Sequence, residues 1–406
     1  MYAKKLSVYD FRCFGKAVLD LNFPGKSSPK PISLPNVNLI LGDNGGGKSS
    51  ILRAVAIAVL APILLESGFV AHRMVRRPDG KNTLLKVDAT LDQIEETSPH
   101  GRKGEEIELL ARFEAREKSS RDSLTLDSTP NTPITDLIFD DHSPAFFVVG
   151  YGATRRVETS DYSESSARRS RGLRYQRVAG LFEDHVAMRP LEIWFRKLDK
   201  QGASKAIDLL NAVLPINLRF TGAFDPIEDQ YAFEFEDRLT PFSALSDGYK
   251  AFIGMVGDLI GHLSDVCPPN MNLADIPGIV LIDEIDLHLH PAWQRTILPD
   301  IAKAFPRLQF ICTSHSPLVA STVQSTNIFV TDRDEHGLAT IKQIEESAFG
   351  RNAEQLLLSS YFGLETTRPE AFEAQAETLF EKAANGDKKA ALTYLESLAA
   401  PAKSAG

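Results

Sequence analysis

A glycine-rich segment with a lysine and two serines is a candidate for binding phosphate groups. Residues 42–50 read GDNGGGKSS, which matches the phosphate-binding loop: two glycines with four residues between them, then Lys and Ser. Backbone N–H groups of such a loop can surround phosphate oxygens, Lys48 can reach the outer phosphates and Ser49 can ligate Mg²⁺. The alternative is a flexible glycine turn with a chance lysine. The predicted nucleotide-binding residues are Gly42, Asn44, Gly45, Gly46, Gly47, Lys48, Ser49 and Ser50.

Two acids follow a strongly apolar segment later in the chain. Residues 278–286 read GIVLIDEID, so four apolar residues precede Asp283 and Glu284. A buried strand would deliver both carboxylates at one edge of a sheet. Hydrolysis of a terminal phosphate requires charge neutralisation and a positioned water, so we expect Asp283 to act on Mg²⁺ and Glu284 to orient or deprotonate the water. The alternative is a strand that simply ends in solvent-exposed acids.

A second candidate anion-binding surface opens a helix at residues 243–250, which read SALSDGYK. Ser246, the N–H group of Gly248 and the helix N-terminus offer hydrogen-bond donors and partial positive charge. A molecule whose own phosphate loop surrounds the nucleotide does not need this second surface. We therefore expect Ser246 and Gly248 to contact the nucleotide of a second copy of the chain.

Four motifs occur in the order found in ABC-type ATPases, which the chain resembles. Residues 245–248 (LSDG) resemble the signature of that family, and residues 313–317 (TSHSP) resemble its switch-histidine segment. The resemblance implies a homodimer, or a higher homo-oligomer, that closes over ATP and Mg²⁺. It also implies catalytic roles for Lys48, Glu284 and His315.

Within that family the chain resembles the branch that includes SMC proteins, RecF and OLD-family nucleases. Residues 9–14 (YDFRCF) resemble the first strand of that branch, which implies that Arg12 contacts the nucleotide, and residues 286–291 (DLHLHP) resemble its D-loop region. Residues 147–155 (FVVGYGATR) resemble a segment of standalone bacterial ATPases, many of which are encoded beside a nuclease in phage-defence systems. This resemblance implies an effector partner, a nuclease on a separate chain.

The apolar segments predict which elements position these motifs. A strand, the glycine loop and a helix at residues 51–65 should follow one another. An antiparallel hairpin is expected at residues 218–237 and one helix at residues 291–306. Strands are expected at residues 6–14, 16–23, 36–42, 84–94, 107–115, 145–152, 278–286, 308–314 and 327–332.

These elements predict an α/β protein: an ABC-type P-loop NTPase head with a mainly parallel sheet, an antiparallel β subdomain, a helical insert and a helical C-terminus. Residues 1–155 and 215–345 are expected to form the two parts of the head. Residues 156–214 are expected to be an arginine-rich helical insert, and residues 346–406 a helical C-terminal region. No long heptad segment interrupts the chain, so coiled-coil arms are not expected.

Composition limits the class of partner and the compartment. The 406 residues carry 45 Lys and Arg against 54 Asp and Glu, a net charge of −9, so a positive field over the whole surface cannot attract nucleic acid. Three widely separated cysteines argue against a disulfide framework. The longest apolar segment, residues 54–65, is interrupted by Pro62 and too short to span a bilayer. We expect a cytoplasmic protein without membrane contact.

The dense basic region lies between residues 155 and 177. It could contact the backbone of DNA or an acidic protein surface. A solvated helical insert with internal ion pairs is an equally good interpretation. The arginines are Arg155, Arg156, Arg168, Arg169, Arg171, Arg174 and Arg177.

Two functions remain open. The first is an ATPase whose nucleotide-driven dimerisation controls an effector in bacterial antiphage defence, and the second is a DNA-binding ATPase of repair or maintenance that resembles RecF and SMC proteins. A weaker alternative is a zinc site formed by His288, His290 and His315. Asp332 and Asp334 mimic an acidic metal pair, but a surface turn is the better interpretation.

Overall fold

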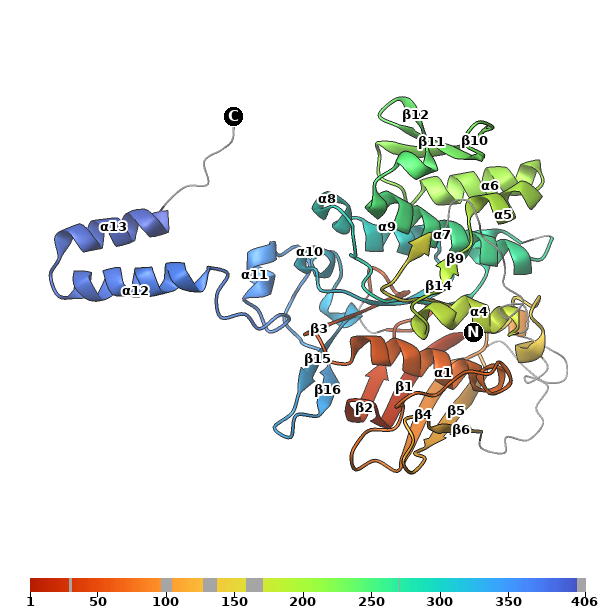
Figure 1. Cartoon of the computed structure of the whole chain (residues 1–406), viewed down its shortest axis with the longest axis horizontal. Helices are drawn as coiled ribbons and strands as arrows, with labels where there is room; N and C mark the ends of the chain where they lie inside the picture. Colours follow the sequence, from red (N-terminus) through yellow and green to blue (C-terminus); the bar gives the residue numbers. More distant parts are fainter. Residues whose placement is uncertain (29–30, 96–103, 127–136, 158–170, 270, 400–406) are drawn as a thin grey trace.

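A large mixed sheet organises the molecule. The computed structural model describes residues 1–406 except 29–30, 96–103, 127–136, 158–170, 270 and 400–406. Eleven strands form one sheet in the order β6-β5-β4-β1-β2-β16-β15-β3-β14-β13-β7, and helices cover both faces (Figure 1). The predicted α/β class is confirmed.

One half of this sheet is parallel and carries the predicted motifs. Strand β3 lies between β14 and β15. Strand β13 lies on the other side of β14, and β7 follows at the edge of the sheet. Each of these neighbouring pairs is parallel. Because the strands are parallel, the phosphate loop after β3 and the acids after β13 lie at the same edge of the sheet. The bounds are β3 (Val37–Gly42), β7 (Val148–Tyr151), β13 (Gly278–Ile282), β14 (Leu308–Thr313) and β15 (Ile328–Arg333).

The other half of the same sheet is antiparallel. Strands β2, β1, β4, β5 and β6 pair in antiparallel fashion, and β16 joins the halves because it pairs with both β15 and β2. The expected antiparallel subdomain is therefore a continuation of the central sheet. The bounds are β1 (Tyr2–Phe11), β2 (Phe14–Asp20), β4 (Asn82–Thr90), β5 (Glu106–Glu114), β6 (Ser123–Thr125) and β16 (Ala339–Lys342).

Side chains of the central strands alternate between two apolar layers. Ile40 and Leu281 pack in the layer that contains α1 (Lys48–Glu66), whereas Leu39 and Val280 pack in the layer that contains α7 (Asp247–Val266). This alternation follows from the two-residue period of a strand. Helix α1 is long and apolar enough to cross a membrane by composition, but it is mostly buried inside the protein and serves as a core helix.

The region between β7 and α7 is mixed. It contains a short two-stranded sheet, several short helices and a separate three-stranded antiparallel sheet that includes the predicted hairpin. The bounds are β8 (Arg156–Val157), α4 (Leu173–Val178), β9 (Ala187–Met188), α5 (Leu191–Trp194), α6 (Lys200–Asn211), β10 (Leu218–Asp225), β11 (Gln230–Phe235) and β12 (Arg238–Pro241).

Short 3₁₀ helices are distributed along the described chain. They are η1 (Gln93–Glu95), η2 (Ala179–Leu181), η3 (Phe195–Lys197), η4 (Phe242–Ala244), η5 (Leu273–Asp275) and η6 (Ser325–Asn327).

The single helix expected at residues 291–306 is wrong, because two helices occupy this segment. They are α8 (Pro291–Gln294) and α9 (Ile297–Ala304), separated by the non-helical Thr296. Pro299 has no N–H group to donate to the carbonyl four residues earlier, so a continuous helix would lose a hydrogen bond there. Pro299 instead lies in the first turn of α9, where backbone N–H groups have no partner within the helix, so no hydrogen bond is lost.

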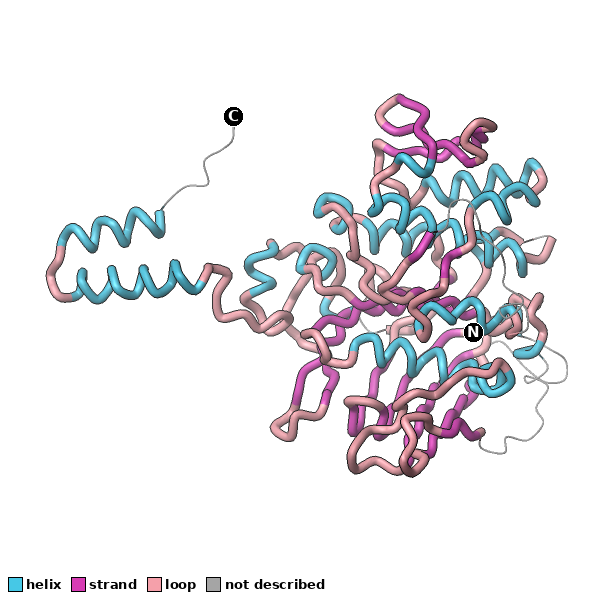
Figure 2. The backbone as a smooth tube through the Cα atoms, viewed as in Figure 1, coloured by secondary structure: helices cyan, strands magenta, loops and turns pink. Residues whose placement is uncertain are grey.

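The C-terminal region is helical, as predicted. After α10 (Pro317–Ala320) and α11 (Ala353–Leu357), helices α12 (Glu370–Ala384) and α13 (Lys388–Ala399) pack against each other. This hairpin extends away from the rest of the molecule (Figures 1 and 2). No residue of α12, which the structure describes in full, is buried.

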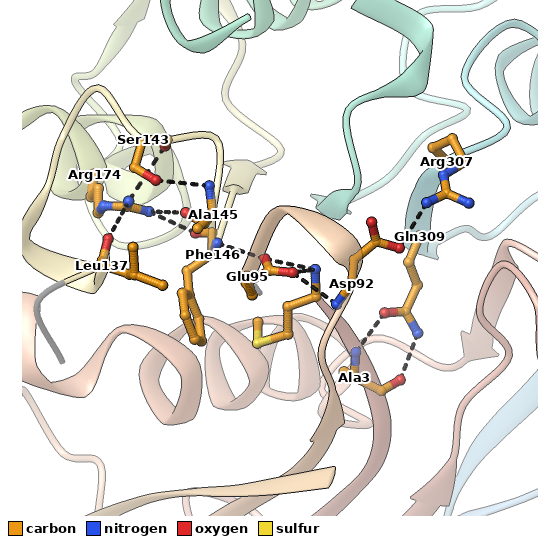
Figure 3. A network of polar contacts seen from close by, with 11 residues as sticks. Ala3, Asp92, Glu95, Leu137, Ser143, Ala145, Phe146, Arg174, Arg307 and Gln309 are labelled. Carbon is orange, nitrogen blue, oxygen red and sulfur yellow. Dashed lines mark hydrogen bonds and ion pairs between the residues drawn. The ribbon is translucent and has the colours of Figure 1, made fainter. Parts of the chain in front are cut away.

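A buried arginine holds the segment before β7. Arg174 is 1% exposed, and its guanidinium donates to the carbonyls of Ala145, Phe146, Leu137 and Asp140 at 2.7–2.9 Å. Figure 3 shows the bonds to Leu137, Ala145 and Phe146. Its side chain is therefore not available to DNA. The prediction that Arg174 belongs to a phosphate-contacting patch is wrong, because both terminal nitrogens of its guanidinium donate to backbone carbonyls in the interior.

Replacing Arg174 by methionine is expected to lower the free energy of unfolding by at least about 3 kcal/mol, because buried carbonyls lose their donors. Urea titration of both proteins measures the loss. Arg196→Met is the control, because Arg196 is 48% exposed and pairs with Asp229; an exposed pair contributes at most about 1 kcal/mol. Equal losses for the two variants would contradict the structural role of Arg174.

Candidate nucleotide site

An open cleft of about 520 Å³ lies between the phosphate loop and the ends of β13 and β14. It brings together most of the residues that the sequence predicts for nucleotide binding and hydrolysis, although they come from four separate segments of the chain. The lining residues are Arg12, Cys13, Asn44, Gly45, Gly47, Lys48, Ser49, Ser50, Arg53, Asp283, Glu284 and His315. The cleft is therefore the candidate site for a nucleotide.

Two glycines of the loop are required by backbone geometry. Gly47 has φ +92°, and a Cβ atom there would lie 2.6 Å from both the Cys13 Sγ atom and the Phe14 ring. Gly42 has φ +137°, and a Cβ atom would lie 2.1 Å from the Thr331 Oγ1 atom. Only glycine fits both positions, because other residues avoid these φ values and would clash. The loop therefore packs closely against Cys13 and Phe14 on one side and against Thr331 of β15 on the other.

Gly47→Ala is expected to weaken ATP binding by about tenfold to a hundredfold, because overpacking costs about 1–3 kcal/mol and must displace the loop. Titration with a fluorescent ATP analogue measures the affinity. Gly25→Ala is the matched control, since Gly25 also has positive φ (85°) but a Cβ atom there would meet nothing within 4 Å. If both variants bind ATP as the parent does, the loop is not the nucleotide site.

Lys48 is buried at the base of the cleft. Its Nζ donates to the carbonyl oxygens of Gly42 and Asp43 at 2.8 and 2.9 Å, so the lysine braces its own loop. Burial lowers the pKa of Lys48, while the charges of Asp283 and Glu284 act in the opposite direction. An anion that accepts from Nζ would replace these carbonyls with a charged partner, which makes a stronger hydrogen bond.

The acids after β13 are fixed by a threonine at the end of β14. The Thr313 hydroxyl donates to the Asp283 carboxylate at 2.6 Å and accepts from the Glu284 N–H group at 2.7 Å. Glu284 has a left-handed backbone, with φ 50°. Thr313 thus couples the two acids, a positioning role that was not predicted although the residue lies two positions before His315.

Arg155 holds the backbone of the same turn. One guanidinium nitrogen donates to the carbonyls of Asp283 and Glu284 at 2.5 and 2.7 Å. The sequence analysis assigned Arg155 to a basic region and did not predict that it would hold the backbone next to the two acids. Its position directly after β7, beside β13 in the sheet, is what brings it to the acids.

Two partly exposed arginines, Arg12 and Arg53, line the cleft. Arg12 lies in the turn between β1 and β2, and its pKa is lowered by burial and then by the charge of Arg53. Arg53 was not predicted as a site residue. The helical spacing could have identified it, because Arg53 lies four residues after Ser49 and therefore on the same face of α1. The two side chains make this part of the cleft positive.

The cleft contains oxygen donors of the type that Mg²⁺ prefers. The Ser49 hydroxyl and the Asp283 carboxylate both line it, and Mg²⁺ in nucleotide sites is held by one or two protein oxygens together with phosphate oxygens. In the described residues no group of three or more His, Cys, Asp or Glu could hold a metal ion. The Ser49 and Asp283 oxygens therefore fit a Mg²⁺ ion whose other ligands are the phosphate oxygens of a nucleotide.

Ser246 and Gly248 lie apart from this cleft. Among the residues that the structure describes, neither lines it. Ser246 caps α7 and accepts from the Tyr249 N–H group at 3.5 Å, and a Cβ atom at Gly248 would lie 2.2 Å from the His288 carbonyl oxygen. The glycine thus allows the first turn of α7 to approach the predicted D-loop segment. Contact with a nucleotide bound to a second copy stays a prediction.

The predicted arginine patch is only partly a surface feature. Arg177 is 2% exposed, so its prediction as a DNA contact is wrong because the side chain is buried. Arg171 pairs with Glu183 at 2.6 Å, as the alternative of internal ion pairs predicted. Arg156 is exposed, whereas Arg168 and Arg169 lie outside the described residues.

Two protein-family models match the chain. The model described as "AAA domain, putative AbiEii toxin, Type IV TA system" matches residues 37–321, and the model described as "AAA domain" matches residues 5–68. The first match contains the phosphate loop, the two acids and His315. It therefore includes the segments that build most of the cleft.

Curated relatives carry related names. The chain is 26% identical over 378 residues to Septu protein PtuA of Bacillus mycoides (strain KBAB4), covering 91% of this chain and 46% of the relative. It is 48% identical over 86 residues to the Retron Ec83 probable ATPase of Escherichia coli, covering 21% and 16% of the two chains. The Retron Vc95 probable ATPase of Vibrio cholerae is 42% identical over 113 residues, covering 28% and 22%. The chain spans less than half the length of these relatives.

A crystal structure of an SMC head bound to the C-terminal winged-helix domain of ScpA is a distant structural neighbour. The identity is 16%, the match covers 85% of this chain and 98% of that one, and the TM-score is 0.48. The fold class rests instead on the sheet itself. The resemblance to an ATPase is confirmed: the match over residues 37–321, more than half of the chain, shows that this protein belongs to the AAA-domain ATPase family of that description.

Proposed function

We propose that this protein binds ATP with Mg²⁺ and hydrolyses it to ADP and phosphate. One observation carries the proposal: the phosphate loop, Asp283, Glu284 and His315 line one open cleft. Lys48 would bind the outer phosphates, and Glu284 would take the proton of the attacking water. His315 is exposed at the cleft, where it can contact the terminal phosphate.

Ser49 and Asp283 would hold the Mg²⁺ ion, which neutralises charge on the phosphates when bound. The hydroxyl of Thr313 directs one carboxylate oxygen of Asp283 and leaves the other for the cation or its water shell. Asn44 and the glycines would donate N–H groups to the phosphates. Arg12 would add positive charge to the cleft.

We further propose that two copies close face to face over two nucleotides. The open cleft and the separate position of Ser246 and Gly248 support this arrangement, since the helix N-terminus of α7 is well suited to bind an anion. Residues 1–155 and 215–345 would form the two parts of the head, because their strands interleave in one sheet. Residues 156–214 would be the insert and 346–406 the C-terminal region.

We propose that this cycle controls an effector protein, a nuclease on a separate chain, in bacterial antiphage defence. The Septu and retron relatives support this setting, as does the resemblance at residues 147–155. Helices α12 and α13 are the proposed docking element, since Phe380, Leu392 and Leu395 are each more than half exposed. The RecF-like alternative has lost support, because two arginines of the expected DNA-binding region are buried.

Expression from the native operon with an affinity tag tests the proposed function. The parent protein should copurify with a nuclease and protect cells from phage, whereas Lys48→Ala should abolish protection. Deletion of residues 366–406 should release the nuclease but leave ATP hydrolysis unchanged. ATP-dependent binding of the lone protein to duplex DNA that weakens steeply with salt, with no copurifying protein, would instead favour the DNA-maintenance alternative.

A further inference from the structure

We propose that a second cavity, separate from the nucleotide cleft, binds a phosphate-type oxyanion through Arg177 and Arg155. This cavity lies at the carboxyl end of β7 and is lined by the loop after that strand, by α4, by β9 and by the middle of α7. Its volume is about 60 Å³. A single water needs roughly 10–15 Å³ by this measure, so the cavity has room for a small tetrahedral anion.

Within the described chain, Arg177 has buried donors without acceptors, although its guanidinium lies over the Phe147 ring, 5.3 Å from the ring centroid. It lines the cavity and is 2% exposed. One of its terminal nitrogens donates to the Asp141 carbonyl at 3.2 Å. Its Nε and Nη1 atoms have no hydrogen-bond partner in the part of the chain that the structure describes. Buried polar groups are nearly always paired, so two idle donors on one buried cation indicate a missing ligand.

Arg155 adds a second positive charge to the same cavity. Its terminal nitrogen is engaged by two backbone carbonyls, but within the described residues its Nε atom has no partner. No carboxylate in the described chain lies within ion-pair distance of either Arg155 or Arg177. Burial lowers the pKa of each arginine to about 10, so both stay charged at neutral pH.

The acids around the cavity are already paired with other groups. Asp258 accepts from the Tyr151 hydroxyl at 2.9 Å and from the Arg189 N–H group at 2.9 Å, and it pairs with His262 at 3.2 Å. Glu183 pairs with Arg171. The charges of Asp283, Asp286 and Glu284 act on the partly exposed Arg155, and those of Asp265 and Asp141 act on the buried Arg177. Within the described residues none of these carboxylates pairs directly with either guanidinium, so a bound anion would supply the direct partner that the buried Arg177 lacks.

The chemistry of the lining favours a phosphate-type ligand. Guanidinium groups present donors in a fixed planar fork that matches the oxygens of phosphate, and such charge-assisted hydrogen bonds are strong. Water could satisfy the donors but would not give either guanidinium a directly bound negative charge. Inorganic phosphate and the phosphate group of a small nucleotide share this chemistry.

One side chain, Arg155, connects the cavity to the proposed catalytic residues. Arg155 lines it and holds the carbonyls of Asp283 and Glu284. An anion on the Nε side of Arg155 would contact the same guanidinium that positions the turn after β13. The site would therefore suit a ligand that regulates the ATPase rather than one that reacts.

Crystals soaked in sodium arsenate test the proposal, because arsenate mimics phosphate and its arsenic atom gives an anomalous signal. The parent protein should show a peak within hydrogen-bonding reach of the Arg177 guanidinium, and Arg177→Gln should lose it. Any peak at residues 42–50 should remain in both, which separates this site from the proposed ATP site. Arg156→Gln is the matched control, since Arg156 is an exposed neighbour of Arg155, and it should keep the cavity peak.

A conservative variant and a competition complete the test. Arg177→Lys keeps the charge and should retain a weaker peak, even if the glutamine variant does not fold. Inorganic phosphate and AMP, each added to the soak, should displace arsenate, and the stronger competitor identifies the source of the phosphate group. Arsenate absent from the cavity of the parent, unchanged by Arg177→Gln, or displaced by neither competitor would overturn the proposal.

Discussion

Replacing Glu284 by glutamine is expected to lower ATP turnover by at least about a hundredfold, since a positioned general base contributes roughly 10²–10⁴ to the rate. ATP affinity should stay within a few-fold of the parent value, because the loop and Lys48 are untouched. Hydrogen bonds to Glu284 in the structure involve its backbone N–H and carbonyl groups, so the substitution should not disturb the turn. Phosphate release and nucleotide titration measure the two effects.

A matched substitution at an exposed acid provides the control for Glu284→Gln. Glu345 is exposed and is not among the described residues that line the cleft, so Glu345→Gln should hydrolyse ATP at the parent rate. The Glu284 variant should also accumulate as a dimer in ATP, which size-exclusion chromatography with light scattering detects. Unchanged turnover in Glu284→Gln would show that the catalytic assignment is wrong.

Mixing two inactive variants is expected to restore hydrolysis. Lys48→Ala removes the phosphate-binding lysine and Ser246→Arg blocks the helix cap, so each protein alone should have almost no activity. A mixed dimer would combine the intact Lys48 of one copy with the intact Ser246 of the other in one of its two sites. With random pairing at equal amounts, the activity should reach about one quarter of the parent value.

The double variant Lys48→Ala/Ser246→Arg mixed with parent protein is the control for this complementation. Its mixed dimers contain no intact composite site, so activity should fall below that expected from the amount of parent protein. The two mixtures contain the same substitutions in different arrangements. If the single variants do not complement each other at any ratio, the sites are not shared between copies.

Local sequence signals predicted the elements that build the cleft because those elements are strongly patterned. The strand at Val37–Gly42 is buried along most of its length, and the glycine loop that follows it is required by positive φ angles. The strand before Asp283 is fully buried. The apolar segments and the glycine spacing are local patterns, so they can be recognised in a single sequence.

Other features depend on tertiary contacts that the local sequence does not encode. Strand β16 was not predicted, because its four residues form a strand only through pairing with β15 and β2. The burial of Arg174 and Arg177 was not predicted, because composition does not distinguish a basic surface from guanidinium groups that donate to buried carbonyls. Arg155 and Thr313 act on residues more than a hundred and about thirty positions away along the chain, and no spacing rule predicts such contacts.

A crystal structure of Glu284→Gln with ATP and Mg²⁺ tests the central claim most directly. The account predicts two copies facing each other, with the terminal phosphate of each ATP bound between the Lys48 side chain of one copy and the first turn of α7 of the other. The Ser246 hydroxyl should lie within hydrogen-bonding distance of that phosphate. A nucleotide-bound dimer in which Ser246 and Gly248 contact no phosphate would contradict it.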